Sequence, residues 1–229
     1  MSEKVRTMFA SIAGKYDLTN SVLSMGTHHQ WRKTAVSISG AKEGMSVLDC
    51  ATGTGDLALE FRKAVGSSGR VLGTDFCAEM METAPEKAAV QKLDVRFETA
   101  DAMDLPYPDN AFDIASIAFG IRNVDDPQQC LKELARVVKS GGKVIVLEFG
   151  QPDGFLKYPY KLYSKYMIPF VGGLITGNRE AYAYLPETSA NFPAGPEFIR
   201  LMKDAGKFRG QEARKLMGGI AYVYAGDVA

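Results

Sequence analysis

The sequence is poor in the residue types that hold metal ions or form disulfides. Only two histidines occur, the neighbours His28 and His29, and no set of Cys, His and Asp has the spacing of metal ligands, so we expect no metal. The three cysteines are odd in number and irregularly spaced, which predicts free thiols in a reducing compartment. The sequence therefore favours neither a metalloenzyme nor a disulfide-stabilised secreted domain.

An excess of charge and long apolar runs are also missing. The 27 basic residues balance the 27 acidic ones, so the overall charge offers no footprint for a nucleic acid, and we expect no such partner. No run approaches the roughly 18 apolar residues of a membrane span. The first residues, Met-Ser-Glu-Lys-Val-Arg, lack the apolar core of a signal peptide, so we expect a cytoplasmic protein.

The sequence does contain a glycine-bearing loop between a short apolar run and a helical pattern, at residues 47–57. The run ends in Asp49, the loop holds Gly53 and Gly55, and Leu57 begins the helical pattern. Glycines let a ligand approach the backbone, and the helix N-terminus that follows offers free N–H groups. The stretch predicts a loop that holds a nucleotide-like ligand, with an ordinary strand-to-helix turn as the alternative.

A second apolar run, residues 70–74, ends in Asp75, about twenty residues beyond Gly55. A carboxylate at this point can accept hydrogen bonds from both ribose hydroxyls of a nucleotide. The alternative is that Asp75 caps a helical segment over residues 78–82. Because residues 53–58 also fit the G-x-G-x-x-A fingerprint of NAD enzymes, the loop alone does not distinguish NAD from another adenosine-bearing cofactor.

Five expected strands alternate with helical patterns, which predicts an α/β fold with a doubly wound, mostly parallel sheet. The strands are residues 47–49, 70–74, 93–100, 111–119 and 143–149. A helix capped by Asp126 and ended by Gly141 precedes the fifth strand. Residues 208–217 and 219–226 are expected to pair as two closing strands.

The chain is expected to open with an amphipathic helix over residues 5–16, which either covers a ligand cleft or lies on the surface. A stretch rich in polar and titratable groups follows at residues 16–33. We interpret it as part of a site, with a capped connector between helices as the alternative.

These features together resemble the class I S-adenosylmethionine-dependent methyltransferases, and closely the C-methyltransferase family of menaquinone and ubiquinone biosynthesis. The general methyltransferase motifs lie at residues 47–55, 75, 101–102, 109–113 and 141–148. The blocks typical of the quinone family lie at residues 9–20, 24–28, 119–124, 182–189 and 191–193, so the resemblance covers nearly the whole chain.

The resemblance implies a seven-stranded, Rossmann-like sheet in a single methyltransferase domain, residues 1–229. Its expected parts are an N-terminal helical cap (1–40), a cofactor-binding core (41–150), an aromatic, substrate-side insertion after strand five (151–195), and a closing helix and strand pair (196–229). The cofactor implied is S-adenosylmethionine. The residues implied to contact it are Thr54, Asp75, Asp101 and Ala102, and those implied to shape its loop are Asp49, Gly53 and Gly55.

The chain departs from the family pattern at three positions. His29 stands where the family usually has arginine, on the quinone side. Ala118 stands in place of a serine near the cofactor, which removes one polar contact. Ala51 replaces the first glycine of the loop, a change that its small side chain can accommodate.

The reaction implied is methylation of a ring carbon of a prenylated quinol, from demethylmenaquinol to menaquinol or on the benzoquinol of ubiquinone synthesis. Transfer from a sulfonium is an in-line displacement, for which positioning lowers the barrier. The ring carbon becomes nucleophilic when a neighbouring hydroxyl loses its proton. Arg122 is the candidate that stabilises the resulting phenolate, with a surface ion pair to Asp125 or Asp126 as the alternative.

The proton acceptor is less closely defined by the sequence. His28 is the candidate because an unperturbed imidazole titrates near neutrality. Two alternatives stand beside it: a structural His28 bonded to a loop carbonyl, and a water placed as the base by Tyr16 and Asn123.

A prenylated quinol is mostly hydrocarbon, so the enzyme needs an apolar slot and a route to the lipid. Residues 155–175 are aromatic, with Lys157, Lys161 and Lys165 at i, i+4 spacing, which predicts weak peripheral contact at the inner face of the membrane. A helix that simply covers the sheet is the alternative.

Two alternative functions stand beside the methylation of a quinol. They are methylation of another lipid or aromatic acceptor, and a non-catalytic scaffold of a quinone-synthesis complex. The oligomeric state is open, with a homodimer among the options.

Overall fold

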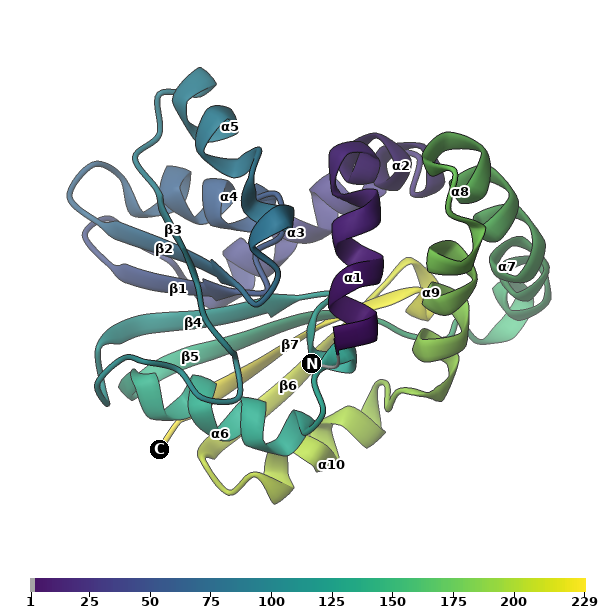
Figure 1. Ribbon diagram of the computed structural model, residues 1–229. Coiled ribbons are helices and arrows are strands. Elements are labelled where there is room, and N and C mark those ends of the chain that lie inside the picture. Colours follow the sequence, from purple (N-terminus) through teal and green to yellow (C-terminus); the bar gives the residue numbers. More distant parts are fainter. Residues whose placement is uncertain (1–2) are drawn as a thin grey trace.

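The computed structural model describes residues 3–229, which form a seven-stranded sheet covered by helices (Figure 1). The strands are β1 (Ser46–Cys50), β2 (Arg70–Asp75), β3 (Arg96–Thr99), β4 (Phe112–Ala118), β5 (Val138–Phe149), β6 (Phe208–Leu216) and β7 (Ala221–Val228). They lie in the order β3-β2-β1-β4-β5-β7-β6, and all neighbours are parallel except β7, which is antiparallel to β5 and β6. The predicted doubly wound, mostly parallel sheet is confirmed, and so is the pairing of the closing strands.

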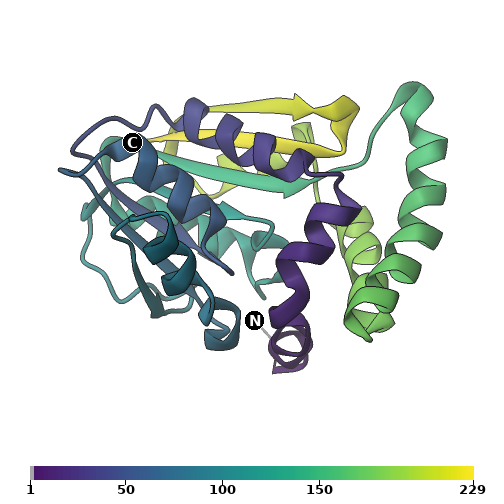
Figure 2. The ribbon, with the colours of Figure 1, turned by 90° about the horizontal axis from the view of Figure 1, so that it is seen from above.

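Helices cover both faces of the sheet because its central strands are apolar on both sides; all five residues of β1 are buried (Figure 2). The helices concerned are α3 (Thr27–Ser39), α4 (Asp56–Val65), α5 (Ala84–Val90), α6 (Pro127–Val137) and α10 (Pro196–Asp204). Trp31 and Phe61 bring α3 and α4 into one apolar core. Leu131 and Phe198 bring α6 and α10 into the other.

The strand order reverses between β1 and β4, which are neighbours at the centre of the sheet. β1 leads through α4 to β2 on one side, whereas β4 leads through α6 to β5 on the other. Leu48 pairs with Ala115, so the loops after both strands leave the sheet side by side. Open α/β sheets bind their ligands at such a reversal, beyond the carboxyl ends of the strands.

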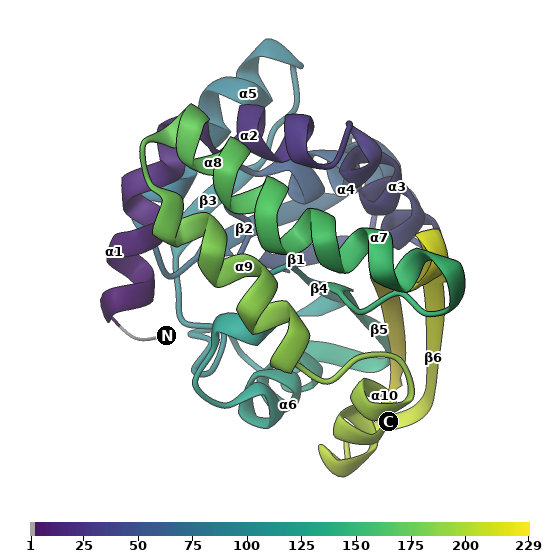
Figure 3. The same ribbon diagram turned by 90° about the vertical axis from the view of Figure 1, so that its right-hand side faces the viewer.

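A layer of helices from two distant parts of the chain lies beyond these strand ends (Figure 3). Its helices are α1 (Glu3–Ile12), α2 (Tyr16–Leu23), α7 (Lys157–Leu162), α8 (Ile168–Thr176) and α9 (Arg179–Asn191), and the π-helical segment Tyr163–Met167 joins α7 to α8. Ile12, Ile168 and Tyr182 form a small apolar core within the layer. The packing of α8 on α9 requires Gly172, because a Cβ there would lie 2.1 Å from Cγ of Tyr182.

Three predicted boundaries differ from the structure. The leading helix ends at Ile12, and a 3-10 turn separates it from α2. The polar stretch 16–33 is mostly helical, in α2 and α3, which are separated at the left-handed Gly26. Helix α6 ends at Val137, so Gly141 lies inside β5 rather than at a helix end, because Val138 already pairs with β4. Within the described chain, no helix is both long and apolar enough to cross a membrane.

Candidate active site

Two adjoining cavities lie beyond the carboxyl ends of the central strands. Asp75 and Asp101 are among the residues that line the smaller cavity. The larger cavity, of about 310 Å³, is lined mainly by apolar and aromatic side chains of the helical layer, together with Arg122. Tyr16 and Phe119 line both cavities, so a ligand in one can reach a ligand in the other at this point.

The smaller cavity is built around the Asp75 carboxylate, at the end of β2. Oδ2 of Asp75 accepts a hydrogen bond from the Gly53 amide, and Oδ1 accepts one from the Cys77 amide, both at 2.9 Å. The first bond ties the glycine loop to β2, and the second resembles the predicted alternative, a cap on the turn after β2. Burial raises the pKa of Asp75, and the two amides oppose this effect. Asp101 and Ala102, beyond the end of β3, line the same cavity.

The loop after β1 needs left-handed backbone at three residues. Gly53 and Gly55 have φ of +55° and +84°, and a Cβ at Gly55 would lie 3.0 Å from the Ala84 Cβ and the Phe97 ring. Ala51 has a φ of +49°, at the position where the family usually has glycine. Its side chain leaves no room at the end of β4, since a Cβ on Gly120 would lie 2.4 Å from the Ala51 Cβ.

Asp49 and Thr54 do not line the smaller cavity, but both stabilise the loop after β1. Asp49 is buried and accepts hydrogen bonds from the Thr52 and Ser116 hydroxyls, each at 2.7 Å. Burial raises the pKa of Asp49 to about 6. The Thr54 hydroxyl donates to Oδ1 of Asp17 in α2 at 2.5 Å, so it connects the loop to the helical layer. The structure thus gives Thr54 a loop-fixing contact rather than a place in the cavity wall.

Arg122 lies in the wall of the larger cavity, and its surroundings exclude the surface ion pair that was the alternative reading. Its side chain is 4% exposed, and Nη1 donates to Oε1 of Glu148 at 2.7 Å and to the Phe119 carbonyl at 2.6 Å. The guanidinium carbon lies 5.3 Å from the centre of the Phe149 ring. Nε is buried and has no hydrogen-bond partner among residues 3–229. The guanidinium therefore places a positive charge in the wall of the larger cavity.

His28 also lines the larger cavity, but it does not titrate near neutrality as the sequence suggested. Burial, the Arg32 guanidinium and His29 together lower the pKa of His28 to about 4. Nη1 of Arg32 lies 2.5 Å from Nδ1, and the Ser21 hydroxyl lies 3.3 Å from Nε2. Since arginine can only donate, Nδ1 accepts and the proton of the neutral ring is on Nε2. Both ring nitrogens are therefore engaged within the protein.

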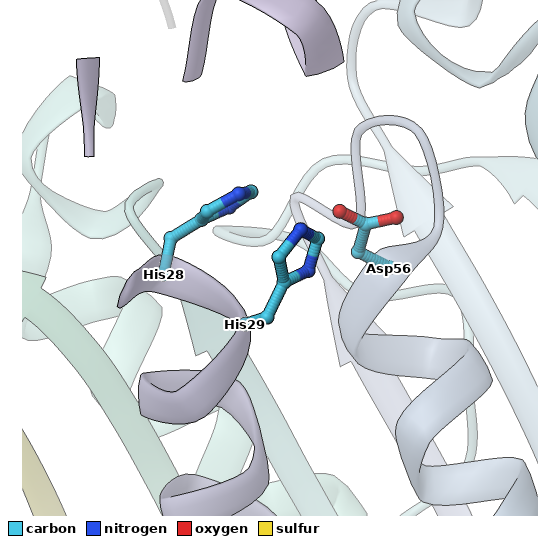
Figure 4. A group of neighbouring side chains, drawn as sticks. All are labelled: His28, His29 and Asp56. Carbon is cyan, nitrogen blue, oxygen red and sulfur yellow. The ribbon is translucent and has the colours of Figure 1, made fainter. Parts of the chain in front are cut away.

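His28, His29 and Asp56 come close enough to offer three ligand atoms to one metal ion, a group that the sequence spacing did not reveal (Figure 4). However, the Asp56 carboxylate already has two positively charged neighbours within the protein. Lys87 is hydrogen-bonded to Oδ1 of Asp56, and Arg32 lies 3.4 Å from Oδ2. A divalent ion here would meet two fixed positive charges, so the surroundings disfavour a metal and our expectation of none stays unchanged.

Tyr16 lines both cavities, and Asn123 connects them through a hydrogen bond. Burial is the main cause that raises the pKa of Tyr16, so its phenol stays protonated at neutral pH. Asn123 lines the smaller cavity, and its side-chain oxygen accepts a hydrogen bond from the Tyr184 hydroxyl of α9 at 3.2 Å. Because Tyr184 lines the larger cavity, this bond connects the two sides of the site.

Known proteins share both the sequence and this architecture. A model of the ubiE/COQ5 methyltransferase family matches residues 1–227. The chain belongs to this family. It is 55% identical to the ubiquinone/menaquinone biosynthesis C-methyltransferase UbiE of Bdellovibrio bacteriovorus, over 99% of this chain and 96% of that one. It is 44% identical to a demethylmenaquinone methyltransferase of Thermus thermophilus, over 96% and 99%. A SAM-dependent methyltransferase structure from Aquifex aeolicus is similar in fold, with a TM-score of 0.65, 24% identity, and 86% and 89% of the two chains covered.

As a member of the ubiE/COQ5 family, the chain is an S-adenosylmethionine-dependent methyltransferase, and the predicted enzyme class and cofactor are confirmed. The relatives lend no support to the other acceptors or to a non-catalytic scaffold. The smaller cavity fits the cofactor on its own geometry: Asp75 offers a buried carboxylate, and Gly53 leaves the loop backbone open. When bound, S-adenosylmethionine supplies a methyl group on a positively charged sulfur.

The ubiE/COQ5 resemblance alone did not reveal the contributions of Glu148 and Phe119. In the sequence Glu148 is only the last residue of the motif 141–148, although an acidic residue at the carboxyl end of a buried strand is a usable signal. Phe119 has a φ of +56° and lines both cavities. Such backbone strain at a non-glycine residue is typical of functional sites but has no sequence signature.

Proposed function

We propose that this methyltransferase acts on a ring carbon of a prenylated quinol and converts demethylmenaquinol to menaquinol. The benzoquinol of ubiquinone synthesis is a second candidate acceptor, because the B. bacteriovorus relative is named for both pathways. The main support is that the smaller cavity, which contains the Asp75 and Asp101 carboxylates, and the apolar larger cavity meet at Tyr16 and Phe119. A polar cofactor and a hydrocarbon acceptor can thereby be aligned for an in-line displacement.

Arg122 stabilises the phenolate that makes the ring carbon nucleophilic. Glu148 and the Phe119 carbonyl hold Nη1, and the guanidinium lies in the wall of the larger cavity that would receive the quinol. A preorganised cation in a low-dielectric site stabilises a developing oxyanion more strongly than water does. Glu148 neutralises this cation when no acceptor is bound.

The geometry supports Tyr16 and Asn123 over His28 as the groups that direct the proton. Both nitrogens of His28 are engaged, and its pKa of about 4 makes it a weak base. Tyr16 lines both cavities, and Asn123 of the smaller cavity accepts a hydrogen bond from Tyr184 of the larger one. We infer that Tyr16 and Asn123 position a water that takes the quinol proton, and that His28 instead holds the Arg32 guanidinium, one turn further along α3, in place beside Asp56.

The tail of the acceptor occupies the rest of the larger cavity, among Ile12, Leu23, Tyr160 and Leu185. Each buried CH₂ contributes roughly 0.8 kcal/mol, so even a few prenyl carbons dominate the binding of the acceptor. The direct test is mass spectrometry of quinones from a host that lacks its own enzyme. Expression of this protein is expected to convert the demethylated quinone, and expression of Arg122→Ala is expected to convert much less of it. An inactive wild type that still binds S-adenosylhomocysteine would reject the acceptor and leave the enzyme class unchanged.

We also infer the setting in which the enzyme works. The three cysteines are free and buried, which supports a cytoplasmic location. The lysines of residues 157–165 support weak contact with the inner face of the membrane. We also propose that residues 1–229 act as one domain. A homodimer stays a prediction, and sedimentation equilibrium would test it by measuring the molar mass of the protein in solution.

A further inference from the structure

The exposed apolar residues of this protein are concentrated on two segments. Ten of the twelve large apolar side chains that are exposed among residues 3–229 lie there, Met167 among them. Leu18, Val22 and Met25 belong to α2 and its C-terminal end. Phe155, Tyr158, Leu162, Tyr166, Phe170 and Leu174 follow one another every three or four residues from the 3-10 turn Gly154–Leu156 through α7 and α8. This spacing places the second set along one side of a nearly continuous helix.

The two sets form one surface, which we call the docking face. The Tyr163 hydroxyl donates to the Leu23 carbonyl at 2.6 Å, and Nζ of Lys15 donates to the Ile175 carbonyl at 2.8 Å. These bonds join opposite ends of α2 and α8, so the helices lie side by side and antiparallel, as Figure 3 also shows. Because α8 packs on α9 through Gly172, its exposed stripe lies on another side of the helix.

The docking face is continuous with the larger cavity. Tyr160 and Tyr163 lie on the other side of the same helical segment and line the cavity wall. Met25 belongs to the docking face, is 82% exposed, and also lines the cavity. Met25 therefore connects the docking face with the wall of the cavity.

The charges beside the docking face favour an anionic surface. Lys157, Lys161 and Lys165 are exposed, and no acidic residue occurs between Asp153 and Glu180. A symmetric contact between two copies through this segment would bring like charges together, which disfavours a dimer here. Lipid phosphates would instead pair with the lysines while the aromatic and aliphatic side chains enter the acyl boundary.

We propose that the docking face inserts into the interfacial region of a bilayer that contains anionic lipids, and that the prenylated acceptor enters the larger cavity from the bilayer beside Met25. The part of this inference that concerns entry of the acceptor rests on the proposed function. Apolar insertion, rather than the lysines alone, supplies most of the affinity.

The test is sedimentation of the full chain with vesicles of phosphatidylglycerol and phosphatidylcholine. Leu162→Ser/Phe170→Ser removes two exposed apolar side chains that do not line the cavity, and its partitioning is expected to fall at least about tenfold. Val90→Ser is the matched control, because Val90 is 77% exposed on α5, and it should partition like the wild type. Lys157→Glu/Lys161→Glu/Lys165→Glu is expected to lose mainly the preference for phosphatidylglycerol.

Activity separates docking from catalysis. The double serine variant should lose turnover on a long-tailed quinol in vesicles in parallel with its binding, and should methylate a short-tailed, water-soluble quinol at the wild-type rate. Wild-type partitioning by this variant, or no partitioning by the wild type, would overturn the proposal. A wild-type dimer that the double substitution dissociates would assign the face to a second copy and also overturn it. Vesicle binding without methylation of either quinol would support docking and reject the proposed acceptor.

Discussion

Arg122 and Glu148 form a buried ion pair, with Nη1 of Arg122 2.7 Å from Oε1 of Glu148 and side chains that are 4% and 1% exposed. Arg122 follows β4, and Glu148 lies near the end of β5, so the parallel pairing of these strands brings the two residues together. Oε2 of Glu148 and Nε of Arg122 have no hydrogen-bond partner in residues 3–229. The pair holds the cation in the wall of the larger cavity.

Replacement of Arg122 should separate catalysis from cofactor binding. Arg122→Ala is expected to lower kcat by an amount equivalent to about 3 kcal/mol, because it removes a preorganised donor to the phenolate. Arg122→Lys should recover only part of the loss, since an ammonium cannot bond Glu148 and a ligand with the same fork. Steady-state kinetics and calorimetry with S-adenosylhomocysteine measure both effects. Arg136→Ala, which breaks an ion pair outside both cavity linings, is the control, and equal losses in the two alanine variants would contradict the role.

Replacement of Glu148 should affect stability more than cofactor binding. Glu148→Gln leaves the Arg122 cation buried without a counter-charge, and removing one partner of a buried pair costs about 3 kcal/mol or more. Urea unfolding measures the loss. The double variant Arg122→Met/Glu148→Gln should recover part of it, because no uncompensated charge remains. Single and double variants of equal stability would show that the pair contributes through packing alone.

The shifted pKa of His28 predicts a pH dependence of stability. The folded imidazole stays neutral down to about pH 4, whereas the unfolded chain takes up its proton near 6.5, so the unfolded state binds more protons between these values. The free energy of unfolding should therefore fall by roughly 2 to 3 kcal/mol from this residue as the pH is lowered through that window. His28→Gln should lack this component. Asp49, with a pKa raised from 3.8 to about 6, acts in the opposite direction in both proteins, so the difference between them isolates His28.

The measurement is urea unfolding of both proteins at about pH 7 and about pH 4.5. Parallel pH dependences in the wild type and His28→Gln would refute the assignment. Because His28 stays neutral near pH 7, the pH dependence of activity in that range should be the same in the wild type and in His28→Gln. A lost titration would restore His28 as the proton acceptor.

Asp75 should decide cofactor affinity. Asp75→Ala removes the acceptor for the Gly53 amide as well as the carboxylate of the cavity, and affinity for S-adenosylhomocysteine is expected to weaken by about 2 to 3 kcal/mol. Asp153→Ala, which breaks an exposed ion pair with Lys215, is the control. Isothermal calorimetry should also find no binding of NAD by the wild type. Unchanged affinity in Asp75→Ala would remove Asp75 from the site.

The strands, the loop and the acidic residue of the cofactor site could be predicted because their signals are local. The buried run of β1, the glycines after it and Asp75 at the end of β2 each depend on nearby residues and on their place in a strand-loop-helix unit. The predicted ends of helices and strands were less accurate where contacts with residues far away in the sequence override the local signals. Pairing of Val138 with Phe112 extended β5 backwards and shortened α6, in conflict with the helix end expected at Gly141.

The sequence by itself determined the sheet and the glycine loop, because apolar periodicity and glycine positions act over a few residues. It also determined the family, through motifs that are spread along nearly the whole chain. Only the tertiary structure decided that Arg122 is buried against Glu148, that Asp17 bonds Thr54, and that α2 lies beside α8. These contacts join residues 26, 37 and 140 positions apart. The tertiary structure also lowered the pKa of His28, since burial and a neighbouring guanidinium are properties of the packed chain rather than of the residue.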